Sequence, residues 1–200
     1  MKSFFKFSGK LILTFIATSL VAFITMMMCL SANIELAIKI VVGCLFIVFI
    51  YYMAWSSSVI SGEEDTKNKR YKNYKGFLAG FVAMIPAIIL SVLYLALTFK
   101  GWEGQNRVIA DGVYMLLYLL FLSFTPILSL FVPYNSAFTI DFAQPAITIL
   151  DNISTPNAVA APMFFIPIII FIIVSGIGYI FGHNERKSLA DVVNKLKNNK

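Results

Sequence analysis

The stretch SGEEDTKNKRYKNYK, residues 61–75, decides how the chain can fold, because it places eight charged side chains between two long uncharged runs. Residues 40–60 before it and 76–99 after it contain no Asp, Glu, Lys or Arg. Apolar runs of about 18 residues or more are typical of membrane-spanning helices, since about 20 helical residues cross a hydrocarbon core of about 30 Å. We therefore expect residues 61–75 to form a loop between two membrane spans.

The composition of the whole chain agrees with this interpretation. The 200 residues are 59% hydrophobic and 13% charged, whereas a soluble domain has about 25% charged residues. The net charge of +6 is concentrated beside apolar runs, where Lys and Arg set the orientation of membrane proteins. The sequence thus predicts an all-α, polytopic transmembrane helix bundle in a lipid bilayer and gives no support for nucleic-acid binding.

Five spans are clear from the apolar runs. A basic start followed by an apolar run could also be a signal peptide cleaved near residue 32, but a run of twenty residues exceeds the usual 7–15 of a cleaved segment. We expect residues 1–32 to be retained. The predicted spans are 11–30, 36–58, 76–99, 112–132 and 158–181.

The count of basic residues favours a sixth crossing. With the N-terminus in the cytoplasm, five plain spans leave eight basic loop residues inside and seven outside, although Lys and Arg normally accumulate on the cytoplasmic side. A further crossing at residues 136–150 changes the distribution to thirteen inside and two outside. We therefore expect a broken sixth crossing there, with the C-terminus cytoplasmic.

The proposed crossing contains the best candidates for a substrate path. Asp141 and Gln144 lie one helical turn apart, directly before Pro145. An ionisable residue inside a membrane is costly and is often functional, and transporters hold ions at broken helices. The alternative is an interfacial loop whose Asp141 contacts water.

Two charged surfaces are expected on the cytoplasmic side. The charged loop either is solvated and orients the bundle, or binds anionic lipid or a membrane partner through Lys67, Lys69, Arg70, Lys72 and Lys75. The tail, residues 184–200, is predicted to be a basic amphipathic helix that lies on the membrane or docks on protein.

Four glycines at a spacing of four residues predict close helix packing. Gly76 and Gly80 begin the third span, and Gly178 and Gly182 end the last one. Small residues at this spacing allow helix backbones to approach closely.

The sequence contains no catalytic or metal-binding motif that we can identify. His183 is the single histidine, and the two cysteines, Cys29 and Cys44, lie in apolar runs as small hydrophobic residues. We predict no catalytic residues, no metal and no cofactor.

Two segments are similar to a known group of proteins. YKGFLAGFVAMIPAIIL, residues 74–90, and GYIFGHNERKSLADVVNKLK, residues 178–197, resemble small, uncharacterised polytopic membrane proteins of low-GC Gram-positive bacteria. The resemblance covers about a fifth of the chain. It implies a bacterial cell membrane and no particular activity.

These observations favour a non-enzymatic accessory or assembly subunit that packs with itself or with a membrane partner. The alternative hypothesis is a small permease or transport subunit with a broken-helix site at Asp141.

Overall fold

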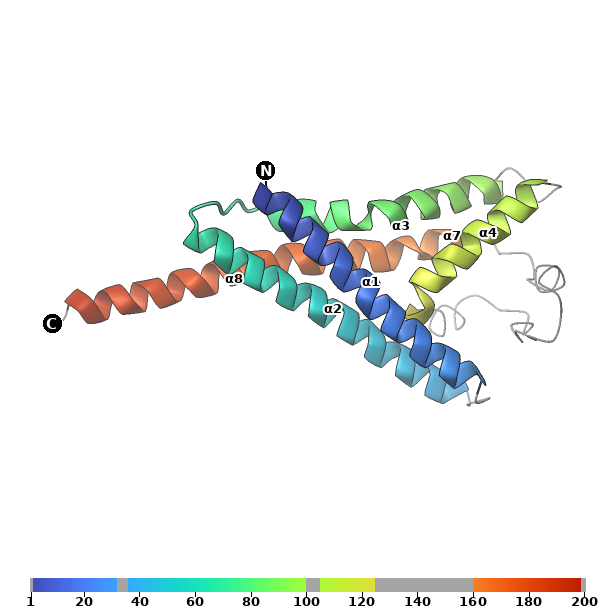
Figure 1. Ribbon diagram of the computed structural model, residues 1–200, viewed down its shortest axis with the longest axis horizontal. Helices are drawn as coiled ribbons and strands as arrows, with labels where there is room; N and C mark the ends of the chain where they lie inside the picture. The colour runs from blue at the N-terminus through green and yellow to red at the C-terminus, as the bar shows by residue number, and fades with distance from the viewer. Residues whose placement is uncertain (1, 32–35, 100–104, 125–159, 199–200) are drawn as a thin grey trace. The chain divides into compact units, whose positions relative to one another are not determined.

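The computed structural model describes residues 2–31, 36–99, 105–124 and 160–198. Every regular element within these ranges is helical, and they contain no strand (Figure 1). The elements are α1 (Lys2–Ser31), α2 (Leu36–Lys67), α3 (Lys75–Phe99), α4 (Gln105–Leu120), the 3-10 helix η1 (Leu122–Phe124), α7 (Ala160–Met163) and α8 (Phe165–Asn198).

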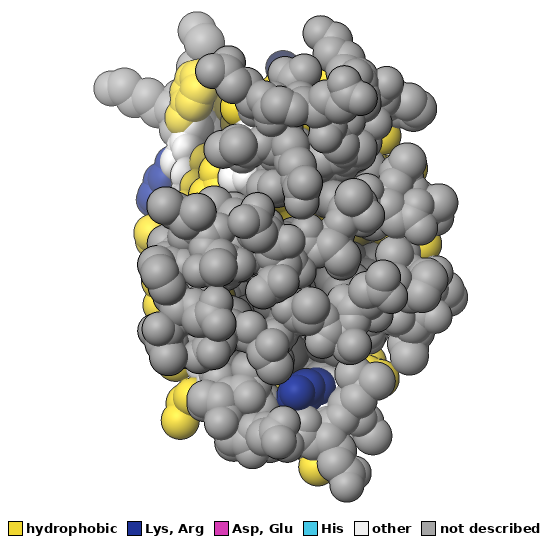
Figure 2. Space-filling model, turned by 90° about the vertical axis from the view of Figure 1, so that its right-hand side faces the viewer, with side chains coloured by type: hydrophobic (Ala, Val, Ile, Leu, Met, Phe, Trp, Pro, Cys, Tyr) yellow, Lys and Arg dark blue, Asp and Glu magenta, His cyan; other side chains and the backbone are white. Residues whose placement is uncertain are grey.

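Four helices in the described ranges are long and apolar enough to cross a membrane. The membrane-length segments are Phe4–Thr25 of α1, Ile38–Lys67 of α2, Lys75–Leu97 of α3 and Phe165–Ser188 of α8. Many of their large apolar side chains are exposed, among them Leu13 and Val48. On the face drawn in Figure 2, the described side chains that reach the surface are mostly hydrophobic. Because water would disfavour such a surface, the four apolar helices indicate a membrane-embedded protein that is helical in its described residues.

The helices extend beyond the predicted spans. α1 begins at Lys2, and α2 continues to Lys67 through the first half of the segment that was expected to be a loop. α8 is one continuous helix through the predicted tail, as Figure 1 shows. Glu and Lys are good helix formers, so a helix need not end where the apolar run ends.

The structure differs more from the sequence prediction in the region of the predicted fourth span, residues 112–132. α4 begins at Gln105 and has 16 residues, fewer than the about 20 that a crossing needs, and η1 follows it. Residues 125–159, which include the predicted crossing at 136–150, lie outside the described residues.

The end of α2 has a specific backbone structure. The Arg70 amide donates to the Asp65 carbonyl at 2.7 Å, and the Lys69 amide donates to the Thr66 carbonyl at 3.1 Å. Lys69 has a φ of 55°. These two bonds around a left-handed residue form a Schellman motif, which satisfies carbonyls at a helix end. The true loop between α2 and α3 is therefore short, residues 68–74.

The chain divides into two compact units. The unit comprising residues 19–47 and 86–167 contains an aromatic cluster. Tyr94 of α3 packs against Tyr114 of α4 at 5.5 Å between ring centroids, and Phe164 lies edge-on to Tyr94 at 6.0 Å. Phe121 also contacts Phe164. Such ring pairs add to the burial of apolar area.

The other unit, residues 1–18, 48–85 and 168–200, is built on very close helix contacts. At Gly182 of α8, an added Cβ would lie 2.1 Å from the Val59 carbonyl oxygen of α2. At Gly62 of α2, it would lie 2.2 Å from the Tyr179 carbonyl oxygen of α8. On α3, a Cβ at Gly76 would meet the Tyr179 side chain at 2.5 Å. Helix α8 thus packs backbone to backbone on α2, and α3 packs closely on α8.

We expect Gly182→Ala to destabilise the protein by about 1–3 kcal/mol, because a backbone carbonyl cannot move aside to accept the new methyl group. Gly9→Ala in α1 is the matched control, since a Cβ there meets nothing within 4 Å. That change should be neutral or stabilise the helix by up to about 1 kcal/mol. Denaturant unfolding of the purified variants in detergent micelles measures both. Equal stabilities for the two variants would contradict the close α2–α8 contact.

Candidate functional site: a polar cluster where four helices meet

A buried ion pair forms the centre of the site. Asp65 in the last turn of α2 accepts a bond from the Lys75 ammonium at the start of α3. The Tyr179 hydroxyl of α8 donates to the same carboxylate oxygen, Oδ2, at 2.8 Å. The side chains of Asp65 and Lys75 are only 7% and 10% exposed. One carboxylate therefore links three helices.

Burial explains why these three groups occur together. A charged group removed from water costs several kcal/mol unless a partner compensates for the lost hydration. Lys75 supplies the opposite charge, and Tyr179 supplies a further donor. Hydrogen bonds that involve a charged group are stronger than those between neutral groups.

An aromatic stack beside the ion pair holds the loop. The Tyr71 ring stacks on Tyr179 at 5.3 Å and on His183 at 3.6 Å, with the rings within 10° of parallel in both cases. His183 Nδ1 is also 2.9 Å from the Thr66 hydroxyl, and either atom can donate. Burial raises the pKa of the Tyr71 phenol above its ordinary value, so Tyr71 stays neutral near pH 7. The loop is thereby attached to α8.

Helix α1 completes the site. Phe7 stacks on Tyr179 with 5.6 Å between ring centroids, and Phe15 packs edge-on against Phe171 of α8 at 5.4 Å. Thr14 lies 3.4 Å from Ser57 of α2, hydroxyl to hydroxyl. The beginnings of α1 and α3, the end of α2 and the middle of α8 therefore meet in one place.

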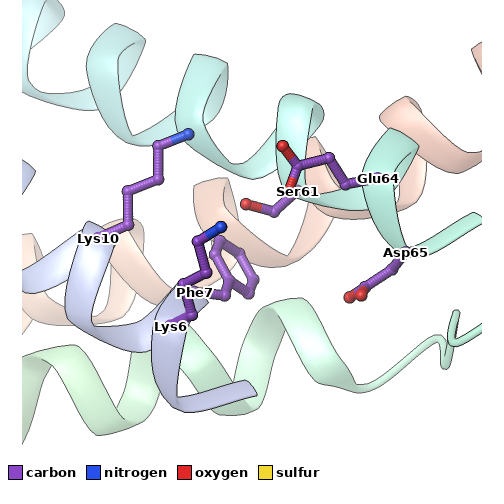
Figure 3. A pocket seen from close by; sticks show the side chains of 6 residues that line it. All are labelled: Lys6, Phe7, Lys10, Ser61, Glu64 and Asp65. Carbon is purple, nitrogen blue, oxygen red and sulfur yellow. The ribbon is translucent and has the colours of Figure 1, made fainter. Parts of the chain in front are cut away.

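A cavity of about 200 Å³ lies between α1 and α2 beside the ion pair. It is lined by Lys6, Phe7, Lys10, Ser61, Glu64 and Asp65. Figure 3 shows the Lys6 and Lys10 side chains extending from α1 and the Glu64 and Asp65 side chains from α2. Among the described residues, no ion pair involves Lys6, Lys10 or Glu64.

The structure divides the predicted basic surface into two parts. Lys75 is buried in the ion pair and takes no part in an outer surface. Four others remain exposed around the short loop: Lys67, Lys69, Arg70 and Lys72. We call these four side chains the basic rim.

The four predicted packing glycines lie at contacts within this chain. Gly76 and Gly80 of α3 face Ser175 of α8, and Gly178 and Gly182 of α8 face Trp55, Ser58 and Val59 of α2. Their surfaces are therefore occupied inside the unit. Asp141 and Gln144, the predicted substrate path, lie outside the described residues.

Sequence reasoning missed the central residues of the site. Asp65 was assigned to a solvated loop, and Tyr179 was not singled out. The pattern Ser58-x-x-x-Gly62 was an available signal, because it matches the spacing of Gly178 and Gly182 on the helix it contacts. Because this pattern reaches into the charged stretch at residues 61–75, it indicated that the helix continues into that stretch.

The described residues offer no group of three or more His, Cys, Asp or Glu side chains that could hold a metal ion. Comparison with protein-family models, with curated proteins and with solved structures gave no match.

We expect Lys75→Met to destabilise the protein by about 3–5 kcal/mol, because it leaves Asp65 as a buried charge without its cation. Asp65→Asn should cost a comparable amount. The double variant should be more stable than Lys75→Met alone, since neither charge remains. Unfolding curves in detergent micelles give the coupling energy of this double-mutant cycle.

Lys67→Met is the control, because Lys67 is an exposed lysine of α2, the helix that carries Asp65, and the change should alter stability by less than about 0.5 kcal/mol. Additive effects of the two single changes in the double variant would show that the pair contributes no coupled stability.

Proposed function

We propose that the protein is a non-enzymatic integral membrane subunit, an accessory or assembly protein that presents the basic rim to the acidic surface of a membrane partner. One observation carries this proposal. The cluster uses Lys75 internally, but the basic rim stays exposed: Lys67 at the end of α2, and Lys69, Arg70 and Lys72 on the loop that follows, which is fixed at both ends.

The fixed loop favours a binding role for the rim. A flexible loop loses conformational entropy when it binds, whereas this loop begins at a Schellman motif, is stacked on α8 through Tyr71 and ends at the buried Lys75. A loop whose backbone is already ordered can present its charges to a complementary surface at a lower entropic cost. Charged rims also increase association rates and specificity.

The packing glycines are not part of the proposed partner surface, because their contacts lie within the chain. The partner would instead meet the rim from the aqueous side, with lipid-exposed apolar side chains such as Leu13 available for contacts inside the bilayer. A second copy of the chain is a weaker candidate for the rim, since four like charges would face each other.

The proposal includes an orientation in the cell membrane. The N-terminus, the loop at residues 68–74 and the C-terminal tail all lie in the cytoplasm, and the chain crosses six times. Contacts of α8 support this orientation. Tyr179 stacks on Phe7 of α1, and His183 contacts Thr66 and Tyr71. The end of the α8 span therefore lies at the end of the bundle where α1 starts. These contacts favour an even number of crossings. The predicted fourth span at residues 112–132 and the predicted broken crossing at residues 136–150 bring the proposed number to six.

We expect a single cysteine at residue 200, in a background with Cys29 and Cys44 changed to Ala, to be protected from a membrane-impermeant maleimide in intact cells. Lysed cells provide the positive control for reactivity. A cysteine at residue 69 should behave in the same way, because both positions face the cytoplasm. Labelling of residue 200 alone in intact cells would contradict the six-crossing orientation.

We expect a charge-reversed rim, with Glu at residues 67, 69, 70 and 72, to lose co-purification with the partner by about tenfold or more, because attraction becomes repulsion. Affinity purification of tagged protein from its native membrane, with quantitative mass spectrometry of the partners, measures this loss. Glu at positions 186 and 187, two exposed basic residues of α8, is the control for a double variant with Glu at residues 69 and 70 only, and these two variants reverse the same number of charges. Retention of every partner by the charge-reversed rim would contradict the proposal.

A further inference from the structure

We propose that the cavity between α1 and α2 is a binding site for the head group of an aminophospholipid, a lipid whose head group joins a phosphate to a primary ammonium. This goes beyond the proposed partner role and rests on different residues. The cavity lining, its position on the helices and the charges around it carry the proposal.

The cavity has basic groups on one wall. Lys6 and Lys10 are four residues apart on α1 and therefore share one helix face, and both are exposed lining residues. Neither is engaged in an ion pair with another described residue. Two ammonium groups on one face suit a phosphate, whose oxygens accept several charge-assisted hydrogen bonds.

The opposite wall is acidic. Glu64 of α2 points toward the space between the helices (Figure 3), and it also makes no ion pair with a described residue. The Ser61 hydroxyl donates to the Ser57 carbonyl at 2.9 Å, which leaves its oxygen lone pairs as acceptors. These groups suit a primary ammonium. A purely anionic head group would have to approach the Glu64 carboxylate, which disfavours it.

The position of the cavity points to a lipid. It lies at the first turns of the α1 span and the last turns of the α2 span, where head groups border the hydrocarbon. Basic pockets between membrane helices bind lipid head groups at this level. The cavity volume of about 200 Å³ is far above the roughly 10–15 Å³ that a single water molecule needs, which leaves room for a small head group.

Apolar side chains continue from the cavity toward the hydrocarbon. Leu13 lies three residues beyond Lys10 on α1, and Ile60 lies four residues before Glu64 on α2. Both are exposed, at 70% and 44%. Acyl chains attached to the bound head group could therefore lie against apolar surface on both helices. Metal binding is a poorer fit, because Asp65 is already paired with Lys75, which leaves Glu64 as the one further carboxylate of the lining, and a metal ion brings no anionic group for Lys6 and Lys10.

The test is lipid binding to the purified full-length protein. Native mass spectrometry in detergent micelles, with phosphatidylethanolamine or phosphatidylglycerol added, reports the lipids retained. We expect the wild type to retain phosphatidylethanolamine preferentially, because phosphatidylglycerol lacks the ammonium. Lys6→Gln combined with Lys10→Gln should weaken phosphatidylethanolamine binding by about tenfold or more, which corresponds to about 1.4 kcal/mol.

Glu64→Gln should abolish the preference for phosphatidylethanolamine over phosphatidylglycerol while phosphate binding persists. Lys187→Gln, which removes an exposed lysine of α8 remote in sequence from the cavity, should retain the wild-type behaviour. All the changed side chains are exposed, so the variants should fold, and unchanged unfolding midpoints verify this. Unaltered lipid binding after loss of both lysines would overturn the proposal, as would wild-type preference for phosphatidylglycerol.

Soluble glycerophosphoethanolamine distinguishes a lipid from a free phosphate ester. Because it lacks acyl chains, it should fail to displace phosphatidylethanolamine at concentrations up to a hundredfold excess. Displacement at equal concentration would assign the cavity to a soluble ligand and would overturn the lipid proposal. Loss of the lipid site leaves the partner proposal standing, since the basic rim and the cavity share no residue.

Discussion

The buried Asp65 carboxylate is the constraint on which this end of the bundle depends. A carboxylate with so little exposure needs partners that compensate for its lost hydration, and these partners come from α3 and α8. The partner from α8 makes further contacts. Tyr179 takes part in stacks with Phe7 and Tyr71, so the same group connects the start of α1 and the loop to the ion pair. One polar interaction thereby aligns four helices that otherwise share apolar and small-residue contacts.

Close packing and electrostatics support each other here. The three-residue cluster of Asp65, Lys75 and Tyr179 can form only if α8 approaches α2 and α3 closely, and the glycines at residues 62, 76 and 182 permit that approach. Within a membrane, helices gain little from burying apolar surface, because lipid is as apolar as a Leu side chain. Small residues and buried polar groups are therefore the means by which helices select their neighbours.

The sequence predicted the helical membrane architecture because hydrophobic runs and their lengths report directly on the bilayer. It also predicted that Gly76, Gly80, Gly178 and Gly182 pack helices, and the structure adds which surfaces they contact. The ends of the helices were harder to predict. Residues 63–65 look like loop residues by charge, yet they continue α2, because helix formation outside the hydrocarbon depends on backbone and capping preferences instead of hydropathy.

The candidate site could not be predicted in detail for a related reason. Asp65, Lys75 and Tyr179 are brought together by tertiary contacts across 114 positions of the chain, and neither spacing nor charge pattern encodes such a contact. Of the five basic residues assigned to one surface, Lys75 belongs to the interior, and only its burial distinguishes it from Lys72. The predictions for Asp141 and Gln144 remain predictions.

The uninterrupted course of α8 has a mechanical consequence. The helix runs from the membrane segment to Asn198 without a break, and residues 189–198 alone extend it by about 15 Å at 1.5 Å per residue. An α-helix resists bending and twisting far more than a loop does, so it can act as a lever arm. A force applied to the outer end of α8 would be transmitted along the helix to Tyr179 and Gly182, which contact α2 closely.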